Sequence, residues 1–218
     1  MLKVKICGFM RPGDVEIASK LGADMVGTIL VPKSPRSVSI AHAKEILAAA
    51  GKGVAKVAVV MPKDLEEIKK MAGEIKPDYL QLHLTFPARD LRVLKGRLNT
   101  KMIVVVPIPQ KIENRWEIIN MAKEAEEAAD IILLDTKGVH GGGTGKTHDW
   151  SLSREICASL KKPVMLAGGL TPLNVREAVR TVRPYAVDVA TGVEQGLGIK
   201  SPELMQEFIQ EARGAAGA

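Results

Sequence analysis

The chain has few aromatic residues, few cysteines and no long apolar run, and each shortage excludes a class of protein. Phe, Trp and Tyr make up 3% of its 218 residues, so the core must consist mainly of Val, Ile, Leu, Ala and Met. Two cysteines do not suit a secreted disulfide framework and favour a reducing compartment. No apolar run approaches the ~18 residues of a membrane span. Since the first strand carries Lys3 and Lys5, it does not resemble a signal peptide. We expect a cytoplasmic globular protein.

The net charge of +6 is explained most simply by an excess of solvated surface lysines. A positive balance also attracts small anionic substrates. Nucleic acid is a poor candidate partner, because no basic run interleaved with aromatic residues occurs. With 46% hydrophobic and 26% charged residues, the composition is typical of a soluble globular domain.

Apolar, β-branched runs alternate with amphipathic segments eight times. The predicted strands lie near residues 4–7, 25–30, 54–61, 79–83, 102–106, 131–135, 164–167 and 186–190. This alternation implies parallel strands joined by right-handed crossovers. It predicts an α/β fold, a single-domain (β/α)8 TIM barrel over residues 1–218, with 214–218 as a frayed tail. An open doubly wound sheet fits less well, because no Gly-x-Gly-x-x-Gly turn follows the first strand.

Helical spacing and start signals support this division of the chain. Apolar residues recur at i, i+3, i+4 and i+7 around residues 43–50, 118–125 and 175–182, and a last helix contains 204–212. Ser201-Pro202 and Thr171-Pro172 place a capping hydroxyl before a first-turn proline. Asp64 and Glu67 can form a capping box. We expect helices to begin at these three places.

Reactive side chains stand where two predicted strands end, Cys7 after the first and Asp135 after the sixth. In barrels, strand ends hold catalytic groups because the strand fixes the side chain while the loop leaves room for substrate. From position alone, a packed thiol is an equally good interpretation of Cys7, and a lone aspartate at a strand end is more often a cap than an acid. Cys157 lies on a predicted helix at core spacing, so we expect it to pack.

Strand alternation places Lys5 and Cys7 on one face and Val4 and Ile6 on the other. If the apolar pair faces the helices, Lys5 lies inside the barrel, one layer below Cys7. A nearby ammonium favours a thiolate. A structural ion pair between Lys5 and Asp188 is the alternative.

Glycine-containing turns follow the seventh and eighth predicted strands, namely Gly168-Gly169 and Thr191-Gly192. TIM barrels commonly bind phosphate between these two loops through backbone N–H groups. Glycine lets the backbone approach an anion, and Thr191 adds a hydroxyl. We expect a phosphorylated small-molecule substrate here, with plain turns as the alternative interpretation.

Residues 141–147 are rich in glycine but match the nucleotide-binding P-loop poorly. Gly141 precedes Gly145 by one residue too few, and the segment does not directly follow a strand. We interpret it as an active-site loop after the sixth strand, with an ordinary linker as the alternative.

A set of short segments is modest individually but specific in its order along the chain. They are residues 3–8, 22–24, 32–36, 81–83, 133–136, 142–147, 149–151, 167–170, 174–176, 184–189 and 191–194. Over nearly its whole length the chain resembles the phosphoribosylanthranilate isomerase family of tryptophan biosynthesis. The resemblance implies an Amadori rearrangement of N-(5-phosphoribosyl)anthranilate to 1-(2-carboxyphenylamino)-1-deoxyribulose 5-phosphate, with no metal or organic cofactor.

The resemblance also implies roles for individual residues. Asp135 would be the general acid that protonates the ribose ring oxygen, and Cys7, as thiolate, the general base at sugar C2. Arg36 would bind the anthranilate carboxylate with its guanidinium fork. Asp188 and His83 are further candidates for substrate contact. Leu84 stands where the family usually has glycine, so a structural role is equally open for His83.

Three other functions remain open on the sequence. A histidine-pathway phosphoribosyl isomerase performs the same rearrangement, but resembling enzymes carry aspartate at the position of Cys7. Indole-glycerol-phosphate synthase would need a catalytic lysine and a longer N-terminal extension. A non-catalytic barrel would bind a phosphorylated sugar without turnover. Family members occur as monomers and homodimers, and we expect one of these states.

Overall fold

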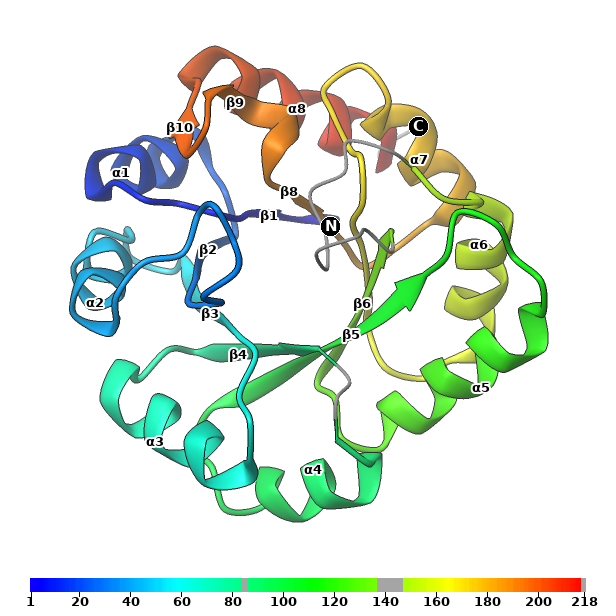
Figure 1. The fold of residues 1–218 in the computed structure, drawn as a ribbon. Coiled ribbons are helices and arrows are strands. Elements are labelled where there is room, and N and C mark those ends of the chain that lie inside the picture. Colours follow the sequence, from blue (N-terminus) through cyan, green and yellow to red (C-terminus); the bar gives the residue numbers. More distant parts are fainter. Residues whose placement is uncertain (84–85, 137–146, 217–218) are drawn as a thin grey trace.

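A closed barrel of parallel strands forms the centre of the computed structural model, which describes residues 1–83, 86–136 and 147–216 (Figure 1). Each strand pairs with the next in sequence, and β8 closes the ring onto β1. The strands are β1 (Lys3–Ile6), β2 (Met25–Ile29), β3 (Ala55–Val60), β4 (Tyr79–His83), β5 (Lys101–Ile108), β6 (Ile131–Thr136), β7 (Val164–Leu166) and β8 (Ala186–Val189). The predicted TIM barrel and its strands are confirmed.

Helices surround the barrel in Figure 1. They are α1 (Pro12–Leu21), α2 (Ile40–Ala48), α3 (Leu65–Ile75), α4 (Ala88–Lys95), α5 (Arg115–Glu126), α6 (Trp150–Ser159), α7 (Val175–Val182) and α8 (Pro202–Ala216). Within the described ranges, no helix is both long and apolar enough to cross a membrane. Residues 214–216, expected in a frayed tail, belong to the last turn of α8, and 217–218 lie outside the described residues.

After β8 the chain makes a short 3-10 turn, η1 (Thr191–Val193), and a two-stranded hairpin. The hairpin consists of β9 (Glu194–Gly196) and β10 (Ile199–Lys200), paired antiparallel. It precedes α8 and lies over the side of the barrel formed by β1 and β8 (Figure 1). This addition brings polar side chains close to the end of β1.

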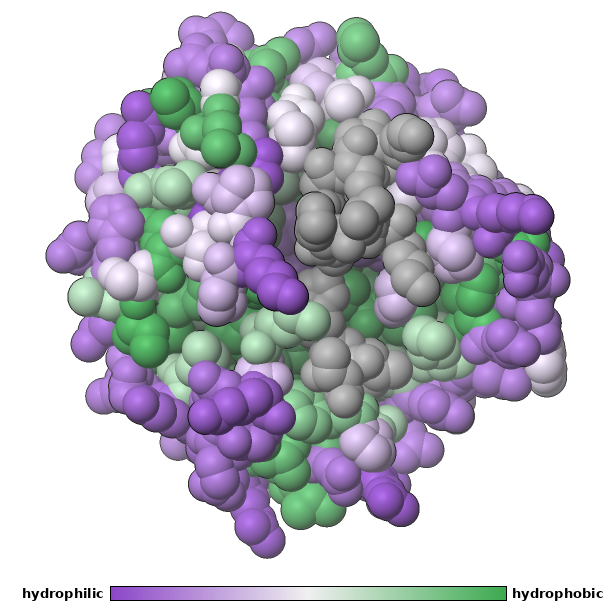
Figure 2. Space-filling view, viewed as in Figure 1, coloured by the Kyte–Doolittle hydropathy of each residue, from purple (hydrophilic) through white to green (hydrophobic). Residues whose placement is uncertain are grey.

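Apolar side chains form two layers, one on each side of the barrel wall. Val4 and Ile6 belong to the large outer layer between strands and helices, as their alternation predicts. Ile131 and Leu133 belong to a smaller layer inside the barrel. Hydrophilic side chains gather at the periphery of the face seen in Figure 2. Cys157 packs against the outer layer, as expected.

Two of the three predicted helix starts are confirmed. The Ser201 hydroxyl accepts a hydrogen bond from the Leu204 N–H (3.2 Å) at the start of α8. Asp64 accepts from the Glu67 N–H (2.8 Å) at the start of α3. The expected start after Thr171 is wrong, because α7 begins only at Val175. The Asn174 amide instead holds the preceding turn, accepting from the Thr171 N–H (2.8 Å) and donating to the Gly169 carbonyl (2.9 Å).

The outer layer should carry most of the stability. Leu91 of α4 is 0% exposed, whereas Leu173 is 92% exposed. We expect Leu91→Ala to lower the free energy of unfolding by about 2–5 kcal/mol, because it removes buried methyl groups and leaves a cavity. Leu173→Ala, the same chemical change, should alter it by less than about 0.5 kcal/mol. Urea unfolding followed by circular dichroism measures both, and equal effects would contradict the assignment of the core.

Candidate active site

A buried ion pair lies inside the barrel beneath the end of β1. Lys5 and Asp188 face each other in the register of β1 and β8, and Lys5 Nζ lies 2.9 Å from Asp188 Oδ2. Their side chains are 0% and 8% exposed. The inward position predicted for Lys5 is therefore confirmed, and the ion pair considered as its alternative role is present. Among the described residues, the other Asp188 oxygen, Oδ1, has no hydrogen-bond partner.

Cys7 is buried in the turn that follows β1, and its N–H donates to the Val189 carbonyl (2.8 Å). Gly27 of β2 makes room for its sulfur. A Cβ atom on Gly27 would lie 2.9 Å from Cys7 Sγ and 3.4 Å from Lys5 Nζ. The Cys7 thiol and the Lys5 ammonium therefore both lie against the backbone of Gly27, where a side chain is absent.

Opposing effects act on the protonation of this pair. Burial raises the pKa of the Cys7 thiol, Lys5 lowers it and Asp188 raises it, and the net direction is upward. Burial disfavours the Lys5 ammonium, but Asp188 and Cys7 outweigh it, so the pKa of Lys5 is also raised. Lys5 thus favours the thiolate, as predicted, without overcoming the cost of burying it.

Asp135 is the penultimate residue of β6 and lies on the same face as Ile131 and Leu133. Burial, assisted by the negative charge of Asp188, raises the pKa of Asp135 to about 7. The backbone of Thr136 and the charge of Lys5 act in the opposite direction. A carboxyl with this pKa can donate a proton near neutral pH.

Cys7 and Asp135 lie far apart in the sequence, but the charges of Lys5 and Asp188 act on both. Lys5 lowers and Asp188 raises the pKa of each group. Both side chains are at the carboxyl ends of their strands, where barrels hold reactive groups. One buried ion pair thus acts on the protonation of both the thiol and the carboxyl.

The Arg36 guanidinium already has a carboxylate partner in the protein. Its Nε and Nη2 donate to the two oxygens of Glu194 at 2.8 and 2.7 Å. Nη2 also donates to the Thr191 hydroxyl (3.2 Å). The side chain crosses the turn at Gly8, where a Cβ atom would lie 2.9 Å from Arg36 Cδ. The guanidinium fork is therefore engaged by Glu194, and the Thr191 hydroxyl also accepts from Arg36. Binding of the anthranilate carboxylate by Arg36 and of the phosphate by Thr191 stay predictions.

The two predicted phosphate loops lie against each other. Gly168 and Gly169 have φ angles of 88° and 67°, a conformation that favours glycine. A Cβ atom on Gly192 would clash with the Leu170 carbonyl oxygen. The close approach of these loops therefore depends on residues without side chains.

A buried chain of three polar side chains stands beside Asp135. The Thr136 hydroxyl is 2.8 Å from His148 Nδ1, and His148 Nε2 is 2.6 Å from the Ser153 hydroxyl. Burial lowers the pKa of His148 to about 4, so its ring is neutral at pH 7. These hydrogen bonds join the end of β6 to α6. It was not predicted, because nothing in the sequence relates these residue types to one another.

Some predicted features lie outside the described residues. These are Leu84, the loop 141–146 and the side chain of His83, whose backbone ends β4. In the described parts of the chain, no three His, Cys, Asp or Glu side chains are grouped so that they could hold a metal ion.

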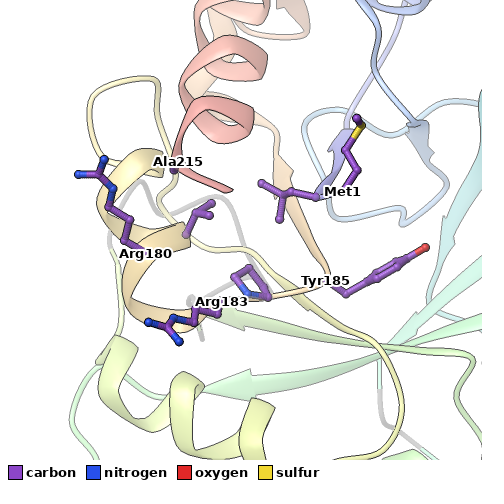
Figure 3. Close-up of a pocket in the computed structure, with 8 residues that line it drawn as sticks. Met1, Arg180, Arg183, Tyr185 and Ala215 are labelled. Carbon is purple, nitrogen blue, oxygen red and sulfur yellow. The ribbon is translucent and has the colours of Figure 1, made fainter. Parts of the chain in front are cut away.

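A separate cavity of about 710 Å³ lies at the amino-terminal ends of β1 and β8 (Figure 3). It is lined by Met1, Leu2, Val179, Arg180, Arg183, Pro184, Tyr185 and Ala215. None of the predicted site residues lines it. Reactive groups in barrels occupy the opposite end, so we do not assign the chemistry to this cavity.

Comparisons with known proteins agree with the geometry. The profile of the N-(5'-phosphoribosyl)anthranilate (PRA) isomerase family matches residues 4–211. The enzyme of that name from Haloferax volcanii is 41% identical over 100% of this chain and 96% of its own length. The crystal structure of phosphoribosyl anthranilate isomerase from Thermotoga maritima is 34% identical, with a TM-score of 0.85 over 98% of this chain and 100% of the other.

A further crystal structure shows such an isomerase in complex with reduced 1-(o-carboxyphenylamino)-1-deoxyribulose 5-phosphate. It is 32% identical, with a TM-score of 0.81 over 98% of this chain and 100% of the other. The match of the family profile and the identity to full-length relatives lead to one assignment. This chain belongs to the N-(5'-phosphoribosyl)anthranilate (PRA) isomerase family.

Proposed function

We propose that the protein catalyses the Amadori rearrangement of N-(5'-phosphoribosyl)anthranilate to 1-(2-carboxyphenylamino)-1-deoxyribulose 5-phosphate in tryptophan biosynthesis. Family membership supports the reaction. The observation that carries the mechanism is the raised pKa of Asp135, about 7, to which the negative charge of Asp188 contributes; the same ion pair acts on Cys7. The reaction is an isomerisation, so a proton donor and a proton acceptor suffice to balance it. Both cysteines are free thiols, in keeping with a cytoplasmic enzyme.

In this mechanism the two groups act in sequence. Protonated Asp135 donates to the ribose ring oxygen, which opens the ring and forms a Schiff base with the anthranilate nitrogen. The Cys7 thiolate then removes the proton from sugar C2, and the resulting enolamine tautomerises to the ketone. Lys5 stabilises the thiolate, while Asp188 keeps Asp135 protonated to a higher pH.

Other residues would hold the substrate. The unpartnered Asp188 Oδ1 suits a sugar hydroxyl, because a buried acceptor without a donor is costly. The backbone of Gly168, Gly169 and Gly192 would bind the phosphate, with the Thr191 hydroxyl as a further donor. Arg36 would bind the anthranilate carboxylate through donors that Glu194 does not occupy.

Adding the protein to freshly made N-(5'-phosphoribosyl)anthranilate should abolish its fluorescence. We expect Cys7→Ala and Asp135→Asn each to lower kcat by roughly 10²–10⁴-fold, the usual contribution of a general acid or base. Cys157→Ala is the matched control and should leave kcat unchanged, since that thiol only packs against the outer layer. Full turnover by either folded site variant would remove that residue from the mechanism.

The pH dependence of kcat/KM follows from the order of the two pKa values. The reactive form has a protonated Asp135 and a thiolate at Cys7. The pKa of Asp135 is about 7, and burial raises the pKa of the Cys7 thiol from its ordinary value, so this form becomes more abundant up to about pH 7. Between the two values the loss of protonated acid balances the gain of thiolate. We expect kcat/KM to rise below pH 7 and then to level off, whereas a fall from pH 7 to 8 would contradict this order.

Asp188→Asn should move the rising limb of that profile to lower pH. Removing the negative charge lowers the pKa of Asp135. The substrate titrates identically with both enzymes, so a difference in limb position belongs to the protein. A limb at the same pH in both would show that Asp188 does not act on Asp135.

Arg36→Met should chiefly raise KM and have a smaller effect on kcat, because the carboxylate it binds is remote from the reacting bonds. Steady-state kinetics on the fluorescent substrate separate the two parameters. A loss confined to kcat would argue against carboxylate binding by Arg36.

A further inference from the structure

Lys200, at the end of β10, is a buried cation that the proposed mechanism does not use. Its side chain is 0% exposed. Its backbone N–H donates to Asp14 of α1 (3.2 Å), and its ammonium lies 5.7 Å from the centre of the Phe9 ring. Burying an unpaired ammonium would be very unfavourable, so its partners must matter to the structure.

The Lys200 ammonium shares a hydrogen-bond partner with Arg36. Nζ donates to the Ala190 carbonyl (2.9 Å), directly after β8, and to Glu194 Oε1 (3.0 Å). The same Glu194 oxygen accepts from Arg36 Nε (2.8 Å). One carboxylate oxygen thus joins the two cations. Burial lowers the pKa of Lys200 and Glu194 opposes this shift.

The guanidinium of Arg36 has five N–H groups in a fixed plane. Within the described residues, three have protein acceptors: one on Nε and two on Nη2, towards Glu194 and Thr191. The two N–H groups of Nη1 are not part of this set. With its Glu194 edge fixed, the guanidinium presents Nη1 in one direction only.

We propose that Lys200 is a positioning residue, which holds Glu194 in place so that Glu194 fixes the Arg36 guanidinium with Nη1 available to the substrate carboxylate. This inference rests on the proposed function. It explains why a hairpin follows β8, since β9 and β10 supply Glu194 and Lys200. While Lys200 is protonated, the trio also carries one net positive charge, which suits an anionic ligand.

A purely structural lysine would make the same contacts, and a double-mutant cycle distinguishes the two roles. The variants are Lys200→Met, Arg36→Met and the double variant, with KM and kcat measured on N-(5'-phosphoribosyl)anthranilate. We expect Lys200→Met to raise KM about tenfold, the effect of a lost charge-assisted hydrogen bond, with little change in kcat. In the Arg36→Met background it should raise KM less than about twofold.

Lys95 provides a matched control. Its ammonium also contacts a carboxylate, Asp130 Oδ1 at 2.8 Å, and a carbonyl, that of Ala129 at 3.0 Å, but on α4 away from the site. Lys95→Met should leave KM unchanged. If Lys200→Met does not fold, Glu194→Gln replaces it in the same cycle, because the amide keeps the shape of the side chain and loses its charge.

The outcomes separate this inference from the proposed function. A wild-type protein without turnover would overturn both. Turnover by the wild type, with the same KM increase from Lys200→Met in both backgrounds, would overturn only the positioning role. An unchanged KM in folded Lys200→Met and Glu194→Gln would also overturn it.

Discussion

The ion pair between Lys5 and Asp188 is the interaction on which the rest of the site depends. Two opposite charges 2.9 Å apart, buried beside the apolar inner layer of the barrel, are weak support for stability, because desolvation offsets their attraction. Their more important effect is on the pKa values of the neighbouring Cys7 and Asp135. The cation acts in favour of a thiolate at Cys7, and the anion acts in favour of a neutral carboxyl at Asp135.

A second cluster of charges stands on the same side of the barrel. Arg36, Glu194 and Lys200 come from the loop after β2 and from the hairpin after β8, and they meet next to the Cys7 turn. The first cluster shifts the pKa values of Cys7 and Asp135, whereas the second is suited to hold an anion. The two clusters are coupled through Cys7, because the charge of Lys200 also lowers the pKa of the Cys7 thiol.

The sequence predicted much of this structure because barrel rules act locally. Alternation along β1 put Lys5 inside, and strand ends marked Cys7 and Asp135. Pairings between distant segments were not predictable: Arg36 and Glu194 are 158 residues apart, and only the closed barrel brings them together. Thr171 failed as a helix start since Asn174, three residues later, satisfies the turn with its own amide, a choice that capping preferences alone do not reveal.

Gly27 contributes to the site by the absence of a side chain. A Cβ atom on Gly27 would lie only 2.9 Å from the Cys7 sulfur, which is too close for both to be accommodated. Positions 7 and 27 therefore limit each other's size, although one lies in the turn after β1 and the other on β2. The placement of the proposed base therefore depends partly on the backbone of a neighbouring strand that takes no part in the proposed chemistry.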